Sequence, residues 1–145
     1  MWAGRWKSDV AEIRLSDDGN RALAEAQSFC RRANVAIVSA EHLLAGALLV
    51  LSESGAEGIP DRTALEAALM LAQGAGSDAF SERVMFGSAA REAINSTAGT
   101  VRQGGGSIIG PRELALGTVD SGNVSPMFFT ALRMARERLR TALSA

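Results

Sequence analysis

The feature that most constrains this sequence is an internal repeat, in which residues 22–46 match residues 93–117 at a constant spacing of 71 without a gap. Five pairs of positions are identical and three keep size and polarity: Ala22/Ala93, Arg31/Arg102, Ile37/Ile108, Leu43/Leu114 and Gly46/Gly117, then Leu23/Ile94, Cys30/Val101 and Val38/Ile109. Each half alone would leave an apolar face in water. We therefore predict two related helical units that pack face to face.

Apolar residues recur at helical spacing along the chain, and no segment shows the alternation of a half-buried strand. Ser16, followed by two aspartates, is expected to cap the first helix, and Pro60 is expected in the first turn of the third. The expected helices cover residues 16–33, 39–51, 60–72, 88 to the glycines at 104–106, 111–119, 125–133 and 135–143. The sequence therefore predicts an all-α fold.

The composition favours one globular domain in the cytoplasm. The chain has 145 residues and 15 basic against 16 acidic side chains, so no overall charge attracts nucleic acid or an anionic membrane. The longest apolar run, residues 43–51, is too short to span a bilayer, and the first ten residues lack a signal-peptide pattern. Cys30 is the single cysteine, which fits a reducing compartment.

No enzyme motif is complete, so we expect no catalysis, cofactor or metal. Gly105 and Gly110 have the glycine spacing of a nucleotide-binding loop, but Pro111 and Arg112 follow where a lysine is needed. One histidine and one cysteine cannot make a two-histidine or cysteine-rich metal site. A Cys30–His42 pair is the remaining alternative, and a core role for Cys30 is favoured over it.

Two longer segments resemble a known family. "LSDDGNRALAEAQSFCRRANVAIVSAEHLLAGALL" resembles the first repeat of the Clp ATPase N-terminal domain, and "FGSAAREAINSTAGTVRQGGGSIIGPRELALG" with "VSPMFFTALRMARERLRTAL" is similar to the second. The most specific element is Glu41-His42-Leu43-Leu44 at a fixed distance from Ser16. The resemblance implies a pseudo-twofold duplicated helical bundle of two Clp-N repeats, with about three to four helices each.

The same resemblance sets the expected boundaries. Residues 1–14 form an N-terminal extension and residues 15–145 a double Clp-N domain, with repeat one at 15–80 and repeat two at 81–145. Repeat one has little room after its motif, so its third and fourth helices are expected to be reduced or merged.

For function, the resemblance implies a noncatalytic, adaptor-like accessory of the Clp chaperone and protease system. No ATPase module follows Ala145, so we expect a stand-alone protein that binds Clp ATPase or protease subunits, adaptors or substrates. Such a protein would regulate proteolysis or chaperone loading.

The resemblance also suggests a ligand site. In some family members the motif glutamate of each repeat holds a guanidinium and a hydroxyl before each first helix meets a phosphate, which gives a phosphoarginine reader. Glu41 and Ser16 match these roles in repeat one, whereas repeat two has Arg112 and Gly87. The alternative function is therefore a receptor for a small ligand or modified residue in the groove between the repeats, near Ser16, Glu41, Arg112 and Glu113.

Two further features have competing interpretations. Glu41 and His42 also fit a purely structural role at a helix start, with Ser39 as the cap and His42 bonding locally. Trp2 and Trp6, outside the resemblance, are either a lid on the core or an aromatic anchor for a partner.

Overall fold

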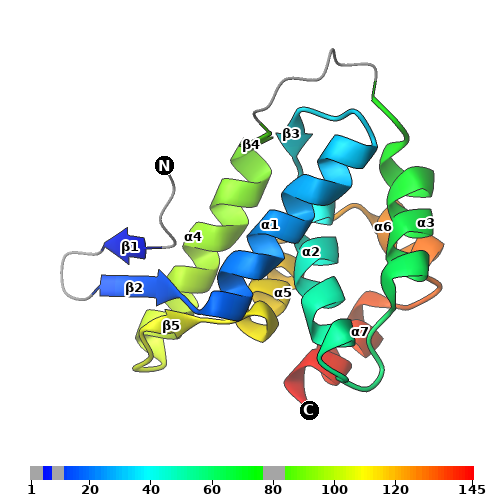
Figure 1. Ribbon diagram of the computed structural model, residues 1–145. Coiled ribbons are helices and arrows are strands. Elements are labelled where there is room, and N and C mark those ends of the chain that lie inside the picture. The colour runs from blue at the N-terminus through cyan, green and yellow to red at the C-terminus, as the bar shows by residue number, and fades with distance from the viewer. Residues whose placement is uncertain (1–4, 8–11, 77–83) are drawn as a thin grey trace.

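The computed structural model describes residues 5–7, 12–76 and 84–145, and it is dominated by helices (Figure 1). The helices are α1 (Asp17–Arg32), α2 (Ala40–Glu53), α3 (Arg62–Gln73), α4 (Ser88–Gln103), α5 (Pro111–Asp120), α6 (Pro126–Leu132) and α7 (Arg136–Ser144). The strands are β1 (Arg5–Lys7), β2 (Glu12–Leu15), β3 (Ile37–Val38), β4 (Met85–Phe86) and β5 (Ile108–Ile109). The all-α fold is confirmed, and each predicted helix is present.

The short strands were not predicted from the sequence, and they connect the two repeats. β2 pairs with β5 in parallel, with Leu15 opposite Ile109, and β3 pairs with β4 in parallel, with Val38 opposite Phe86. The strand before one repeat's first helix thus pairs with the strand before the other repeat's second helix. Strands of two to four residues are too short to show clear alternation in the sequence, and the partners in these parallel pairs lie far along the chain.

A shift of 71 residues carries α1 onto α4 and β3 onto β5, residue for residue. The backbone hydrogen bonds between the repeats follow the same shift. Ser16 N donates to Ile109 O at 2.9 Å, and Gly87 N donates to Val38 O at 3.0 Å. Gly87 is the counterpart of Ser16, and Val38 is the counterpart of Ile109, so the two bonds are equivalent. The bundle therefore has the predicted pseudo-twofold symmetry.

The identical glycines of the repeat allow the helices of each unit to pack closely. A Cβ at Gly46 in α2 would lie 2.3 Å from the Ala22 carbonyl oxygen in α1, and a Cβ at Gly117 in α5 would lie 1.8 Å from Thr97 Oγ1 in α4. Both separations are far below van der Waals contact. The match between Gly46 and Gly117 therefore reflects a packing requirement in each unit.

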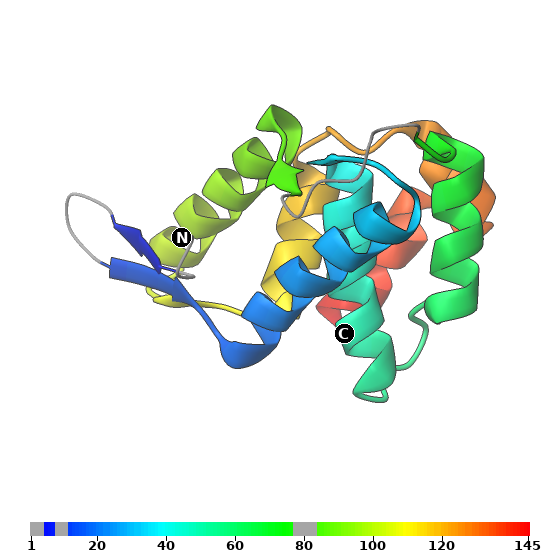
Figure 2. The ribbon, with the colours of Figure 1, turned by 45° about the horizontal axis from the view of Figure 1, so that its top comes forward.

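Helix α2 forms the centre of the molecule. Every residue from Ala40 to Leu51 is buried, and α2 packs against α1, α3, α4 and α5. In Figures 1 and 2, α3 and α4 lie on opposite sides of the molecule, with α1 and α2 between them. Apolar spacing predicted a helix at residues 39–51 with one apolar face, but α2 is buried on all sides, and Glu41 and His42 are buried with it.

The two repeats differ after their second helices, as expected. A shift of 71 places α3 on α7, whereas α6 corresponds to the loop at residues 55–61. Repeat one therefore has a loop where repeat two has a short helix. Pro60 was expected in the first turn of the third helix, and this was wrong, because α3 begins at Arg62. Asp61 is the N-cap residue and accepts a 3.0 Å hydrogen bond from Ala64 N, so Pro60 lies before the helix.

At the start of each repeat's second helix, a side chain in the first turn accepts a hydrogen bond from the backbone N–H of the N-cap residue. Ser39 N donates to His42 Nδ1 at 3.2 Å before α2, and Gly110 N donates to Glu113 Oε1 at 2.8 Å before α5. His42 is 2% exposed, and burial lowers the pKa of its imidazole from 6.5 to about 4, although Glu41 beside it acts in the opposite direction. The neutral ring is therefore the form that caps α2.

The N-terminal residues lie partly in the sheet. β1 pairs antiparallel with β2, with Trp6 opposite Ile13, and Ile13 is fully buried. Trp2 lies outside the described residues. The end of the predicted extension at residues 1–14 thus contributes an apolar side chain to the core.

The glycine packing predicts a contrast between two substitutions in helices. Gly46→Ala should lower the free energy of unfolding by about 1–3 kcal/mol, because the new methyl group would overlap the backbone of α1. Gly99→Ala should raise it by up to about 1 kcal/mol, because a Cβ there meets no atom within 4 Å and alanine favours a helix. Urea denaturation measures both, and equal stability of the two variants would contradict the packing.

The cap of α2 predicts that stability depends on pH through the single histidine of the chain. The unfolded ring takes up a proton near pH 6.5, but the folded ring does so only near 4. The stability that depends on the neutral ring is therefore fully present above about pH 6.5 and is lost as the pH falls towards 4. We expect the free energy of unfolding to fall by about 1.5 kcal/mol between about pH 6.5 and 5.

His42→Gln is the control, because glutamine can accept the Ser39 N–H bond and does not titrate. Its stability should stay nearly constant over this pH range in the same denaturation experiment. A fall as steep as that of the unsubstituted protein would show that other groups cause it.

Candidate functional site

Glu41, the motif residue of repeat one, binds the start of a helix in repeat two. Its side chain is buried, and its Oε2 accepts a hydrogen bond from Ser125 N at 2.5 Å. Ser125 is the N-cap residue of α6. A carboxylate at this position satisfies a backbone donor that α6 itself leaves unpaired. Glu41 thus joins the two repeats.

Arg112 occupies the equivalent position in repeat two and binds the end of a helix. Its guanidinium donates to Leu143 O and, at 3.4 Å, to Ala142 O in the last turn of α7. A cation is favourable there, because helix carbonyls are unpaired at the C-terminus and the dipole is negative. The negatively charged Glu41 thus meets the positive start of α6, and the positively charged Arg112 meets the negative end of α7.

Ser16 and Glu113, the other two predicted site residues, act as helix caps. Ser16 Oγ accepts from Gly19 N at 2.9 Å, and Glu113 Oε1 accepts from Gly110 N. A Cβ on Gly110 would lie 3.7 Å from Ser16 Oγ and 2.8 Å from Glu113 Oε1, so the structure brings these two side chains together. Glu41 and Arg112 bind other elements. All four residues thus bond to backbone groups of the chain itself.

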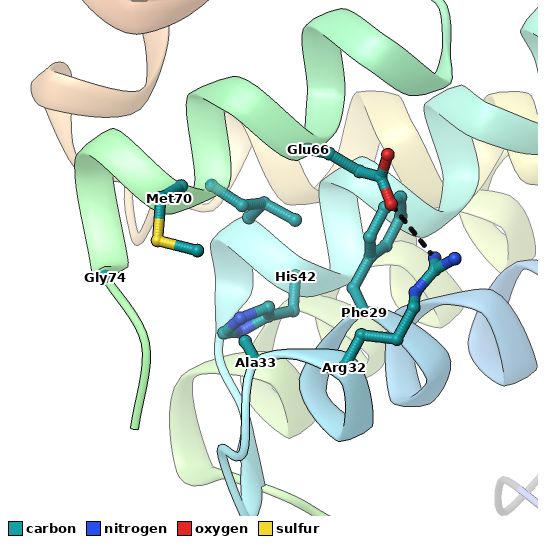
Figure 3. Close-up of a pocket in the computed structure, with 8 residues that line it drawn as sticks. Phe29, Arg32, Ala33, His42, Glu66, Met70 and Gly74 are labelled. Carbon is teal, nitrogen blue, oxygen red and sulfur yellow. Dashed lines mark ion pairs between the residues drawn. The ribbon is translucent and has the colours of Figure 1, made fainter. Parts of the chain in front are cut away.

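A pocket that was not predicted lies between α1, α2 and α3 and has a volume of about 190 Å³ (Figure 3). Its wall is mostly apolar, and an ion pair joins Arg32 to Glu66 at 3.5 Å. The guanidinium of Arg32 also lies 5.4 Å from the centre of the Phe29 ring. The residues that line the pocket are Phe29, Arg32, Ala33, His42, Glu66, Leu69, Met70 and Gly74.

A second pocket of about 340 Å³ lies between α4, α5 and α7. A shift of 71 relates three of its residues to those of the first pocket: Phe29/Thr100, His42/Glu113 and Leu69/Arg140. This pocket is more polar than the first, and Arg140 binds Asp120 through bonds of 2.8 and 3.2 Å. The two repeats therefore form pockets at related places but with different chemistry.

Cys30 is fully buried, and burial raises the pKa of its thiol to about 12. The thiol donates to Ile37 O at 3.7 Å, while His42 Nδ1 bonds to Ser39, so the alternative of a Cys30–His42 pair finds no support. Within the described ranges, no group of three or more His, Cys, Asp or Glu side chains could hold a metal ion. No helix in the same ranges is long and apolar enough to cross a membrane. Among the described residues, Cys30 and His42 therefore do not form a nucleophile and base pair.

Comparison with known proteins gives a likeness to solved structures. No family model matches the sequence, and no curated protein matches it either. Among solved structures, the chain is similar to the N-terminal domain of the caseinolytic protease-associated chaperone ClpD from Arabidopsis thaliana, with a TM-score of 0.72 and 20% sequence identity. The likeness covers 90% of this chain and 94% of that domain. The resemblance seen in the sequence is thus confirmed in three dimensions, and the chain has the fold of a Clp N-terminal domain.

Proposed function

We propose that this protein is a noncatalytic binding module of the Clp chaperone and protease system. The observation that carries the proposal is the extent of the structural likeness, which includes nearly the whole ClpD domain and nearly the whole of this chain. Its partners would be Clp ATPase or protease subunits, their adaptors or their substrates, in the cytoplasm. By binding them it would regulate proteolysis or chaperone loading.

The side chains support binding over catalysis. Cys30 is buried and protonated, and the capping bond of His42 Nδ1 prevents that atom from acting as a general base. The paired helices and the central α2 form a rigid scaffold, which suits a protein-binding surface. Trp2 and Trp6 remain proposed anchors for a partner, and Trp6 lies on β1.

The alternative function is a receptor for a modified residue such as phosphoarginine, with Ser16, Glu41, Arg112 and Glu113 as its site. The present contacts weigh against it, because a guanidinium ligand would have to displace Ser125 N from the buried Glu41 carboxylate. Arg112 would also repel a second guanidinium in repeat two.

The proposed function predicts direct association with Clp proteins of the source cell. We expect the purified protein to crosslink to a Clp subunit, adaptor or substrate in native lysate, as identified by mass spectrometry. Added to the purified Clp ATPase and protease, it should change the degradation rate of a fluorescently labelled unfolded protein. An excess of unlabelled protein is the competition control. Recovery of no Clp component, together with an unchanged degradation rate, would contradict the proposal.

Calorimetry with phosphoarginine tests the alternative. We expect at most one molecule bound per chain, because Arg112 replaces the second motif glutamate, and any heat should vanish in Glu41→Gln. Glutamine keeps a carbonyl oxygen for Ser125 N, so this variant should remain folded, as circular dichroism can check. Free arginine and inorganic phosphate are the controls. A stoichiometry of two would show that Arg112 does not block the second site.

A further inference from the structure

The first pocket contains a hydrogen-bond donor whose identity follows from the cap of α2. A backbone N–H can only donate, so the 3.2 Å bond from Ser39 N requires an unprotonated Nδ1 on His42. The neutral imidazole then carries its proton on Nε2. Ser39 Oγ lies 2.8 Å from the same Nδ1, and in this tautomer its hydroxyl can donate to Nδ1 as well.

No hydrogen bond of Nε2 is found among the residues that the structure describes, and Nε2 is not one of the fully buried atoms without a partner, so it is reached from the pocket. The side chain of His42 is nevertheless 2% exposed and lines the pocket. A ligand that covered this donor without offering an acceptor would leave it unsatisfied at a cost in free energy, whereas an acceptor oxygen would replace the hydrogen bond to water. The pocket therefore selects for a group that carries such an oxygen.

The rest of the wall selects for an apolar group. Phe29, Ala33, Leu69 and Met70 supply carbon surface, and Met70 is 53% exposed at the mouth. A volume of about 190 Å³ is below the range of pockets for drug-sized molecules and cofactors. It suits one apolar side chain with the adjoining part of a backbone.

The mouth of the pocket is electrically balanced. In Figure 3, Arg32 and Glu66 point towards one another, joined by their ion pair, and Met70 lies apart from them. Because the two charges offset each other, a free terminal carboxylate gains little net attraction. The carbonyl oxygen of an uncharged peptide group is the better match for a single N–H donor.

We propose that this pocket binds one apolar residue from within a partner polypeptide, whose side chain packs against Leu69 and Met70 while its backbone carbonyl oxygen accepts a hydrogen bond from His42 Nε2. The polypeptide nature of the ligand rests on the proposed function. Repeat two has no equivalent site, because the carboxylate of Glu113 carries only acceptors and Arg140 replaces Leu69. Each chain thus holds one such subsite.

Nuclear magnetic resonance tests the subsite with a defined probe, N-acetyl-L-leucine N-methylamide. The single histidine gives one set of ring signals, and the unbound protein should show the Nε2–H tautomer. Adding the probe should shift the Nε2 resonance and the Met70 methyl signal with one saturable curve. The Met127 methyl, on a residue that is 56% exposed and lines neither pocket, should not move.

Two variants and a matched control locate the binding. Ala33→Leu, which fills the pocket, and Met70→Glu, which charges its mouth, should each weaken probe binding by about tenfold or more. Met127→Glu makes the same change at an equally exposed methionine on α6 and should bind as the unsubstituted protein does. Amide spectra of each variant confirm that it is folded.

Several outcomes would overturn the subsite. These are an unmoved His42 ring at saturating probe, an equal loss of affinity in Met127→Glu, and tighter binding of N-acetyl-L-leucine, which would make the ligand a chain end. Failure of the subsite is distinguishable from failure of the proposed function. A Clp partner could be captured while the probe leaves His42 unmoved, and the probe could bind at His42 in a protein that captures no Clp partner.

Discussion

The fold depends on backbone hydrogen bonds that each repeat makes with the other. Ser16 N bonds to Ile109 O, and Gly87 N bonds to Val38 O, so the residue that caps each first helix is fixed to the strand before the other repeat's second helix. These bonds satisfy polar groups that would otherwise be buried without partners. They also set the positions at which the caps of α2 and α5, and thus the two pockets, can form.

The helices were predictable from the sequence because their signals are local. Ser16 and Ser39 cap the helices that follow them, and apolar spacing marks the rest to within a few residues. The strands were not predictable, since β2 and β4 pair with segments of the opposite repeat. The burial of α2 on all sides was missed for a related reason, because the neighbours that cover it come from both repeats.

The candidate site was predictable only in part. The motif directed attention to Glu41 and its counterpart Arg112, but their partners lie 84 and 31 residues away in sequence. No local pattern reveals that one side chain meets the start of α6 and the other meets the end of α7. The first pocket was missed because three helices form it, and the sequence gives no sign that Phe29 and Met70 face a common space.

The duplication gives each repeat the same cap, and the chemistry of the capping side chain then separates the two repeats. Glu113 and His42 both offer an acceptor to the backbone before their helices. A carboxylate has only acceptors left after that bond, whereas a neutral imidazole still has one donor on the opposite side of its ring. In repeat one His42 lines its pocket together with Leu69, but in repeat two the position equivalent to Leu69 is Arg140. A histidine in the capping position can therefore stabilise the scaffold and offer a hydrogen-bond donor to a partner at the same time, whereas a carboxylate at Glu113 offers only acceptors.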